Sequence, residues 1–179
     1  LEQERRRIAN TLIDVGRTVA SSLQRDEVLQ SILKQMQRVV DYDGATIMLK
    51  SDNNKHPMDL VIAASRGENS IPSGARVRFG DTSYAMQVYH RQEPVIVGNI
   101  SEDDTAWFDM QMDDDIPNQT LTGKIRSWIG VPMMTGQEVI GYIFLNSFEA
   151  HHYSQPDADT AFALARQAAI AVENARLFE

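Results

Sequence analysis

Residue types that commonly carry catalysis or bind metals are sparse in this sequence of 179 residues. It contains no cysteine, which excludes thiolate metal ligands, cysteine nucleophiles and thioether-linked chromophores. His151 and His152 are adjacent, so on a helix or a strand their side chains point apart and cannot form the i, i+4 pair that binds zinc. We therefore expect no metal site.

Two other segments match ligand-binding motifs only in part. Residues 113–115 are aspartates, as at the start of a calcium loop, but Pro117 and Asn118 stand where a third ligand and the turn glycine belong. Lys124 follows a glycine, as in a phosphate-binding loop, but the next residue is Ile125 rather than serine or threonine. No carboxylate lies in an apolar run that would raise its pKa toward that of a general acid. The sequence therefore predicts that the chain is not an enzyme.

The composition limits the kinds of partner that the protein can bind and the compartment in which we expect it. The net charge is -8 and the pI is about 5.0, which opposes nonspecific binding to nucleic acid or to anionic membranes. No apolar run approaches the roughly 20 residues that span a bilayer. We expect a soluble, cytoplasmic protein with one hydrophobic core, no nucleic-acid partner and no membrane insertion.

The segment from Glu102 to Asp115 combines acidic and bulky apolar residues. It holds seven carboxylates and no basic residue, together with Trp107 and Phe108. Like charges favour an exposed loop, whereas the aromatic side chains favour burial. The segment is thus either a lid whose aromatic residues close a pocket or a local plug of the core beneath a solvated loop.

The N-terminal 23 residues show apolar side chains at spacings of four and three, which predicts a helix with one apolar stripe. The stripe consists of Ile8, Leu12, Val15 and Val19. This spacing is also that of an a/d seam, through which two copies can form a short coiled coil. We expect residues 1–23 to be a signalling and dimerisation helix, and residues 24–179 to be the domain. Asp26 is the expected N-cap of a second helix that extends to about residue 40.

The remaining chain predicts an α+β domain with a mostly antiparallel sheet of five or six strands. The expected strands are 45–50, 60–65, 76–79, 93–97, 127–133 and 139–145. The expected helices run to residue 91, with Thr82 or Ser83 as the cap, and from residue 156 to 178. A short turn containing Gly136 joins the last two strands into a hairpin. Residues 139–145 have almost no polar face, so this strand must be covered on both faces.

This order of elements resembles the GAF domain, a small sensory module of signalling proteins. The residues that carry the resemblance are the 127–148 hairpin, the closing helix, the start of the second helix at residues 26–29, and the strand at 44–49. The resemblance implies terminal helices on one face of the sheet and a loop- and helix-enclosed cavity on the other. It also implies small-molecule binding, homodimerisation, or both. The parent would be a two-component or related signalling protein, such as a sensor kinase or a response regulator.

Several family subtypes are incompatible with this chain. Members that hold a bilin, and methionine sulfoxide reductases of this fold, use cysteines that it lacks. We therefore expect no covalently attached bilin, and the sequence does not identify another cofactor. Two alternatives stay open: a ligand-free structural dimerisation domain, and a PAS-like sensor with a similar sheet. Because the sequence ends at Glu179 within a predicted helix, we expect that helix to continue toward an output domain in the same chain.

If a cavity exists, its walls come from the hairpin, the short helix after Ser83 and the acidic segment. The expected ligand-binding residues are Phe79, Tyr84, Trp107, Phe108, Ile125, Ser127 and Ile129. Trp128 is an equal candidate, because strand alternation defines two faces but does not say which one is the cavity face. Lys124 and Arg126 could supply a cation for an anionic ligand.

Overall fold

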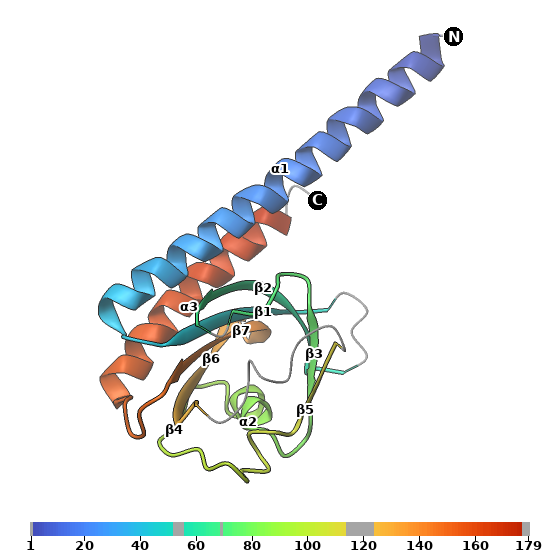
Figure 1. The fold of residues 1–179 in the computed structure, drawn as a ribbon. Coiled ribbons are helices and arrows are strands. Elements are labelled where there is room, and N and C mark those ends of the chain that lie inside the picture. The colour runs from blue at the N-terminus through green and yellow to red at the C-terminus, as the bar shows by residue number, and fades with distance from the viewer. Residues whose placement is uncertain (1, 52–55, 69, 114–123, 177–179) are drawn as a thin grey trace.

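The computed structural model describes residues 2–51, 56–68, 70–113 and 124–176, without the side chains of residues 15–23 and 176. Its helices and strands follow one another along the chain as shown in Figure 1. In order they are α1 (Glu2–Val39), β1 (Gly44–Lys50), β2 (Asp59–Gly67), β3 (Arg76–Phe79), α2 (Tyr84–Arg91), β4 (Val95–Val97), β5 (Met110–Met112), β6 (Ser127–Thr135), β7 (Glu138–Ser147) and α3 (Gln155–Arg176). The α+β class expected from the sequence is confirmed.

The strands form one sheet of seven in the order β4-β6-β7-β1-β2-β3-β5, with every neighbouring pair antiparallel. The prediction of five or six strands missed β5, which has only three residues and lies within the acidic segment. β5 forms because it pairs with β3, a contact between residues more than 30 positions apart that local sequence does not reveal. The expected strand at 93–97 is β4, which lies at one edge of the sheet and follows Pro94, a residue without a backbone N–H to donate.

The hairpin of β6 and β7 lies inside the sheet, as its apolar pattern predicts. Gly136 has φ +61° in the turn between these strands, a conformation that glycine adopts readily. Along β7, Ile143 and Leu145 face one hydrophobic core, whereas Tyr142 and Phe144 face another. The strand is therefore covered on both faces.

The first core lies between the sheet and the two terminal helices, which run side by side over one face (Figure 1). From α1 it contains Leu29, Leu33 and Met36, each fully buried. α3 contributes mostly small residues: Ala158, Ala161, Ala165, Ala168, Ala169 and Val172. Small side chains let this helix lie close to β6 and to α1, both of which it contacts. The predicted placement of both helices on one face is confirmed.

The predicted break between two N-terminal helices is wrong, because α1 is one continuous helix of 38 residues. Asp26 does not cap a helix; its carboxylate accepts a hydrogen bond from the Arg25 guanidinium at 3.4 Å. Aspartate within a helix costs only a few tenths of a kcal/mol, which packing of residues 29–40 on the sheet offsets.

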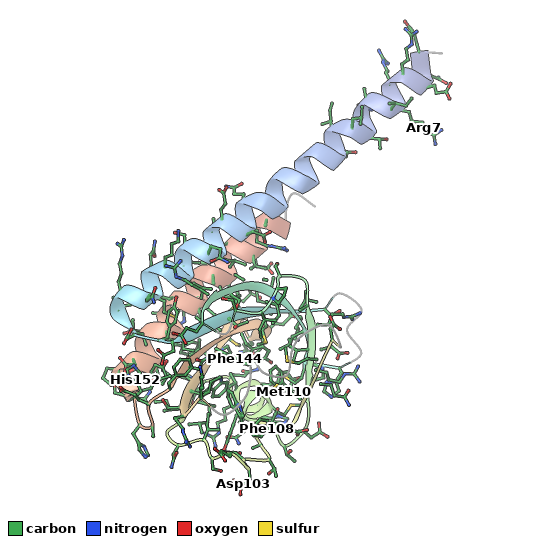
Figure 2. All side chains as sticks on the ribbon, viewed as in Figure 1. Arg7, Asp103, Phe108, Met110, Phe144 and His152 are labelled. Atoms are coloured by element: carbon green, nitrogen blue, oxygen red, sulfur yellow. The ribbon has the colours of Figure 1, made fainter. Side chains whose placement is uncertain are left out.

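The N-terminal part of α1 extends beyond the domain, where Figure 2 shows Arg7 far from the sheet. Ile8 and Leu12 of the predicted dimer seam are 58% and 67% exposed, and Ile13 beside them is 53% exposed. The side chains of Val15 and Val19 lie outside the described part. The described part of the seam is thus exposed in this single chain, and the role of the seam in dimerisation stays a prediction.

Candidate ligand-binding cavity

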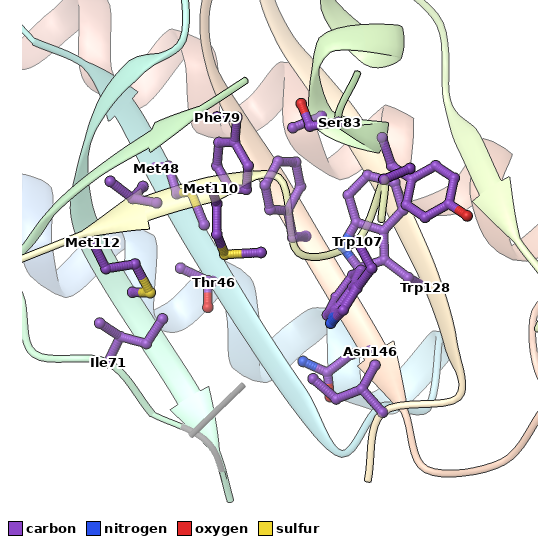
Figure 3. Close-up of a pocket in the computed structure, with 16 residues that line it drawn as sticks. Thr46, Met48, Ile71, Phe79, Ser83, Trp107, Met110, Met112, Trp128 and Asn146 are labelled. Carbon is purple, nitrogen blue, oxygen red and sulfur yellow. The ribbon is translucent and has the colours of Figure 1, made fainter. Parts of the chain in front are cut away.

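A cavity lies on the sheet face opposite the terminal helices, between the sheet, α2 and the segment that leads into β5 (Figure 3). Its volume is about 60 Å³, which exceeds the space needed for one water molecule. The lining residues are Thr46, Met48, Ile71, Val77, Phe79, Ser83, Tyr84, Ala85, Ala106, Trp107, Met110, Met112, Ile125, Trp128, Phe144 and Asn146. The described lining thus holds many apolar side chains, a few polar ones and no acidic or basic one.

Strand alternation builds the floor of the cavity. Thr46 and Met48 project from β1, and Phe144 and Asn146 project from β7, while the residues between them face the terminal helices. In the register of the sheet, Thr46 lies opposite Phe144 and Asn146 lies opposite Trp128 of β6. Three neighbouring strands therefore present their side chains to one space.

Aromatic rings form one wall. The Trp128 ring lies 4.9 Å from the ring of Phe144 and 6.2 Å from that of Trp107, both edge to face. Phe79 packs edge to face on Phe144 at 5.6 Å, and Tyr84 lies 6.3 Å from Trp128. These separations lie in the range in which aromatic pairs stabilise each other beyond simple burial. The rings contact one another in a chain, so a displacement of the Trp107 ring would also displace the Trp128 ring.

Trp107 is held over the cavity by a hydrogen-bonded turn. Asp104 Oδ1 accepts hydrogen bonds from the backbone N–H groups of Ala106 and Trp107 at 3.1 and 3.2 Å. Its Oδ2 accepts a hydrogen bond of 2.6 Å from the hydroxyl of Tyr84 on α2. Burial, with this carboxylate as the second cause, raises the pKa of Tyr84 to about 12. Asp104 thus joins the segment to α2.

A second aspartate fastens the other end of the same segment. Asp109 Oδ2 accepts hydrogen bonds from the N–H of Thr82 at 2.9 Å and from its hydroxyl at 2.5 Å. The Asp109 carbonyl accepts a hydrogen bond from Gly80 N–H at 2.9 Å. Glycine is required there, since a Cβ on Gly80 would lie 2.1 Å from the Asp109 carboxylate. The carboxylates of the acidic segment therefore build structure, which the charge pattern alone did not indicate.

The polar lining groups differ in how they are satisfied. Ser83 caps α2: its hydroxyl accepts a hydrogen bond from Met86 N–H at 3.1 Å and donates one to the Gly80 carbonyl at 2.7 Å. The hydroxyl of Thr46 lies 3.5 Å from that of Ser65. Asn146 Oδ1, by contrast, is buried and has no hydrogen-bond partner among the residues that the structure describes.

Four residues of the predicted site line the cavity: Phe79, Tyr84, Trp107 and Ile125, together with the alternative Trp128. Three do not. Phe108 is 42% exposed and borders a smaller hollow with Arg126. Ile129 lies in the helix-covered core, and the buried Ser127 hydroxyl donates to the Glu149 carbonyl at 2.6 Å. The alternation of β6 places these two on the opposite face from Trp128.

Sequence reasoning missed the lining residues from β1, β5 and β7, among them Met110, Met112, Phe144 and Asn146. β7 is apolar on both faces, so its pattern does not assign Phe144 to either. The proposed cations are not part of the cavity lining: Lys124 is exposed, and Arg126 borders the smaller hollow. The calcium-like run lies outside the described residues from Asp114 onward.

The described residues contain no group of three or more histidine, aspartate or glutamate side chains arranged to hold a metal ion. Among the described helices, none has the length and apolar character needed to cross a membrane.

The profile of a family described as "GAF domain" matches residues 22–173. Two curated relatives are regulators: the formate hydrogenlyase transcriptional activator FhlA of Escherichia coli is 21% identical over 94% of this chain, and the Nif-specific regulatory protein of Herbaspirillum seropedicae is 20% identical over 74%. In each case the match spans 23% of the relative's own length.

Solved structures share the fold. The GAF domain from Acinetobacter phosphoenolpyruvate-protein phosphotransferase has a TM-score of 0.67 and 19% identity, covering 93% of this chain and 95% of its own. A type II free methionine-R-sulfoxide reductase from Thermoplasma acidophilum has a TM-score of 0.63 and 17% identity, covering 86% and 96%. At these identities the likeness concerns the fold alone.

Proposed function

The chain belongs to the GAF-domain family, and we propose that it is a non-catalytic sensory module that binds a small molecule in the cavity beneath Trp107. The observation that carries this proposal is the construction of the cavity. The cavity is largely apolar and its described lining is uncharged. The segment above it is held by Asp104, which binds Tyr84 of α2, and by Asp109, which binds Thr82 just before α2. A few polar groups in an otherwise apolar cavity are typical of small-molecule sites.

The same strands offer a route from the cavity to the terminal helices. Trp128 on β6 faces the cavity, and its neighbour Ile129 faces the core beneath α1 and α3. A ligand that displaces Trp128 would therefore also move Ile129 against the helix layer. Protein interiors are closely packed, so a small displacement of one side chain moves its neighbours. We propose that occupancy of the cavity biases the position of the terminal helices.

We further propose that the helices act in a homodimer. The exposed stripe at Ile8 and Leu12 would pair with the same stripe of a second copy in a short coiled coil. Apolar side chains at a/d spacing stabilise a helix when a partner helix buries them. A sensor built this way would pass its signal to an output domain of a longer protein. The curated regulators, of which the match spans 23%, support a regulatory role, which we propose to be in transcriptional regulation or two-component signalling.

The reductases among the structural neighbours raise the question of catalysis. This chain has no cysteine, so no thiol is available to reduce a sulfoxide or to form a disulfide with a resolving thiol. We propose a regulatory rather than an enzymatic role on this ground. The assignment to the GAF family replaces the PAS-like alternative.

A second candidate is a ligand-free dimerisation module. The small size of the cavity and the dense aromatic cluster around it favour this candidate, since a filled core needs no ligand. The two candidates differ in what stabilises the folded chain. A ligand that binds only the folded state raises the unfolding temperature with its concentration, whereas a ligand-free module shows no such response.

The test is a thermal-unfolding screen with a panel of uncharged metabolites, combined with sedimentation to determine the oligomeric state. The sensory proposal predicts a dimer and a concentration-dependent rise in the unfolding temperature for at least one compound. The matched control is Ala85→Leu, which adds side-chain volume to the cavity wall and should abolish the rise. A dimer without any rise would favour the dimerisation module, and a monomer would refute the proposed coiled coil.

A further inference from the structure

We infer that the ligand of this cavity is an uncharged molecule with a carbonyl group, whose oxygen accepts hydrogen bonds from the side-chain amide of Asn146 and from a tryptophan indole. The two tryptophans in question are Trp107 and Trp128, which line the cavity together with Asn146. This inference rests on the proposed function, because it specifies what the cavity binds. It begins from three N–H donors that have no acceptor among the residues that the structure describes.

Two of these donors belong to side chains that are almost completely buried. Trp107 is 8% exposed and Trp128 is 3% exposed. The indole N–H of a buried tryptophan usually has a hydrogen-bond partner. Neither Nε1 atom donates to a described residue here, and each retains accessible surface of its own. Two buried rings in the cavity wall thus carry donors that are free to bind a ligand.

The third donor is the amide of Asn146, whose two polar atoms differ in accessibility. Oδ1 is buried, whereas Nδ2 retains accessible surface and donates no hydrogen bond to the described residues. The strand register places Asn146 directly opposite Trp128, and Figure 3 shows it beside Trp107. A Cβ on Gly44, its neighbour on β1, would lie 2.8 Å from Nδ2, so glycine leaves room for the amide there. The amide and the two indole rings therefore lie close together in the lining.

This group of donors selects a ligand that accepts hydrogen bonds. A carbonyl oxygen has two lone pairs, so it can accept from the amide and from an indole at the same time. Two of the lining hydroxyls are already engaged, because Tyr84 donates to Asp104 and Ser83 donates to the Gly80 carbonyl. The rest of the described lining is mostly apolar, which suits an apolar body attached to the carbonyl group.

Charge disfavours ionic ligands. No described residue of the lining is acidic or basic, so an ion entering the cavity would lose hydration without gaining an opposite charge. A carboxylate meets a further penalty from the Asp104 carboxylate beside Tyr84 and from the net charge of -8. An uncharged ketone, ester or amide meets neither cost, since the N–H donors replace the water that its carbonyl oxygen loses.

The experiment uses three small probes that share a planar, branched shape: acetone, isobutene and acetate. They carry a carbonyl oxygen, a CH₂ group in its place, and a carboxylate, so they separate hydrogen-bond acceptance from shape and from charge. The readout is the N–H signals of the Asn146 amide and of the indoles in the NMR spectrum. The chain has only two tryptophans, so Trp107→Phe and Trp128→Phe assign the indole signals. A proton that donates to a carbonyl oxygen moves downfield.

The inference predicts that acetone shifts the Asn146 amide signal and at least one indole signal downfield in a saturable manner. Isobutene should cause no downfield shift, and acetate should not bind. Binding of isobutene without binding of acetone would overturn the inference and leave the cavity proposal intact. Tighter binding of acetate than of acetone would overturn it as well. If none of the probes moves any of these signals, the result counts against the cavity as a binding site and against the inference with it.

Two variants test the assignment to Asn146. Asn146→Leu removes the donor with little change in volume and should weaken acetone binding about tenfold without weakening that of isobutene. Thr46→Val is the matched control: it removes a hydroxyl that lies 3.5 Å from that of Ser65 on the same floor, and it should leave acetone binding unchanged. Acetone binding that Asn146→Leu leaves unchanged would overturn the inference. If Asn146→Leu does not fold, the shifts in the wild-type chain decide the question.

Discussion

The hydrogen bond from Tyr84 to Asp104 offers a sharp test of how the segment over the cavity is held. Tyr84→Phe removes the hydroxyl that donates to Asp104 at 2.6 Å and leaves the ring in place beside Trp128. The pKa of Tyr84 is raised from 10.0 to about 12, with burial as the largest cause and the hydrogen bond to Asp104 as the second. A shift of two pKa units corresponds to about 2.7 kcal/mol.

Only part of that energy belongs to the hydrogen bond. Burial is the larger cause, and Tyr84 is partly exposed, so solvent screens its interaction with Asp104. We expect Tyr84→Phe to lower the free energy of unfolding by about 1 kcal/mol at pH 7, measured by urea denaturation. The matched control is Tyr89→Phe on the same helix, whose hydroxyl makes no hydrogen bond to the described residues, and which should change stability by a few tenths of a kcal/mol.

The pH dependence carries a definite sign. The folded-state pKa of Tyr84 lies above the unfolded value of 10.0, so its stabilisation is fully present below pH 10 and is lost as the pH rises toward 12. The difference between wild type and Tyr84→Phe should therefore shrink above pH 10 and change sign before pH 12, because ionisation of Tyr84 removes about 2 kcal/mol from wild type and nothing from the variant. A difference that stays constant across this range, or a variant as stable as wild type at pH 7, would refute the proposed role of this bond.

Three further predictions concern the sheet, the helix layer and the dimer. Gly141→Ala should destabilise the fold by about 2–3 kcal/mol in urea denaturation, because its Cβ would lie 2.4 Å from the Met48 carbonyl of β1; wild-type stability would contradict the register of β1 and β7. Leu33→Ala, on the buried face of α1, should lower the free energy of unfolding by about 2–5 kcal/mol in the same assay. Lys34→Ala, on the exposed face of the same helix, should lower it by less than about 0.5 kcal/mol. Leu12→Glu should convert the proposed dimer to a monomer in sedimentation without changing stability per protomer; an unchanged sedimentation coefficient would exclude this stripe as the seam.

The parts of the fold that the sequence predicted well are those with strong local signals. Gly136 between two apolar runs predicted the hairpin of β6 and β7. Thr82 and Ser83 predicted the start of α2, and Ser83 is the cap, since its hydroxyl accepts from Met86 N–H. The closing helix predicted from residue 156 is α3, and its alanines lie in the core beneath it. In each case the residues that form the signal also make the contact.

The parts that could not be predicted depend on distant contacts. β5 exists through its pairing with β3, and the continuity of α1 through residue 26 depends on packing that begins at Leu29. The face of β6 could not be assigned either, because Trp128 and Ile129 are both buried and apolar. For the same reason the pattern of β7 gave no indication that Asn146 lies in the cavity, although a lone polar residue in an apolar strand is the signal that could have singled it out.

The central claim is that the cavity beneath Trp107 binds a small molecule, and native mass spectrometry tests it most directly. Wild type and Ala85→Leu would be incubated with the same metabolite extract and measured side by side. The claim predicts a noncovalent adduct of small mass on wild type that is absent from Ala85→Leu, whose added side chain fills the cavity. Two proteins that carry the same adduct, or none, would contradict it.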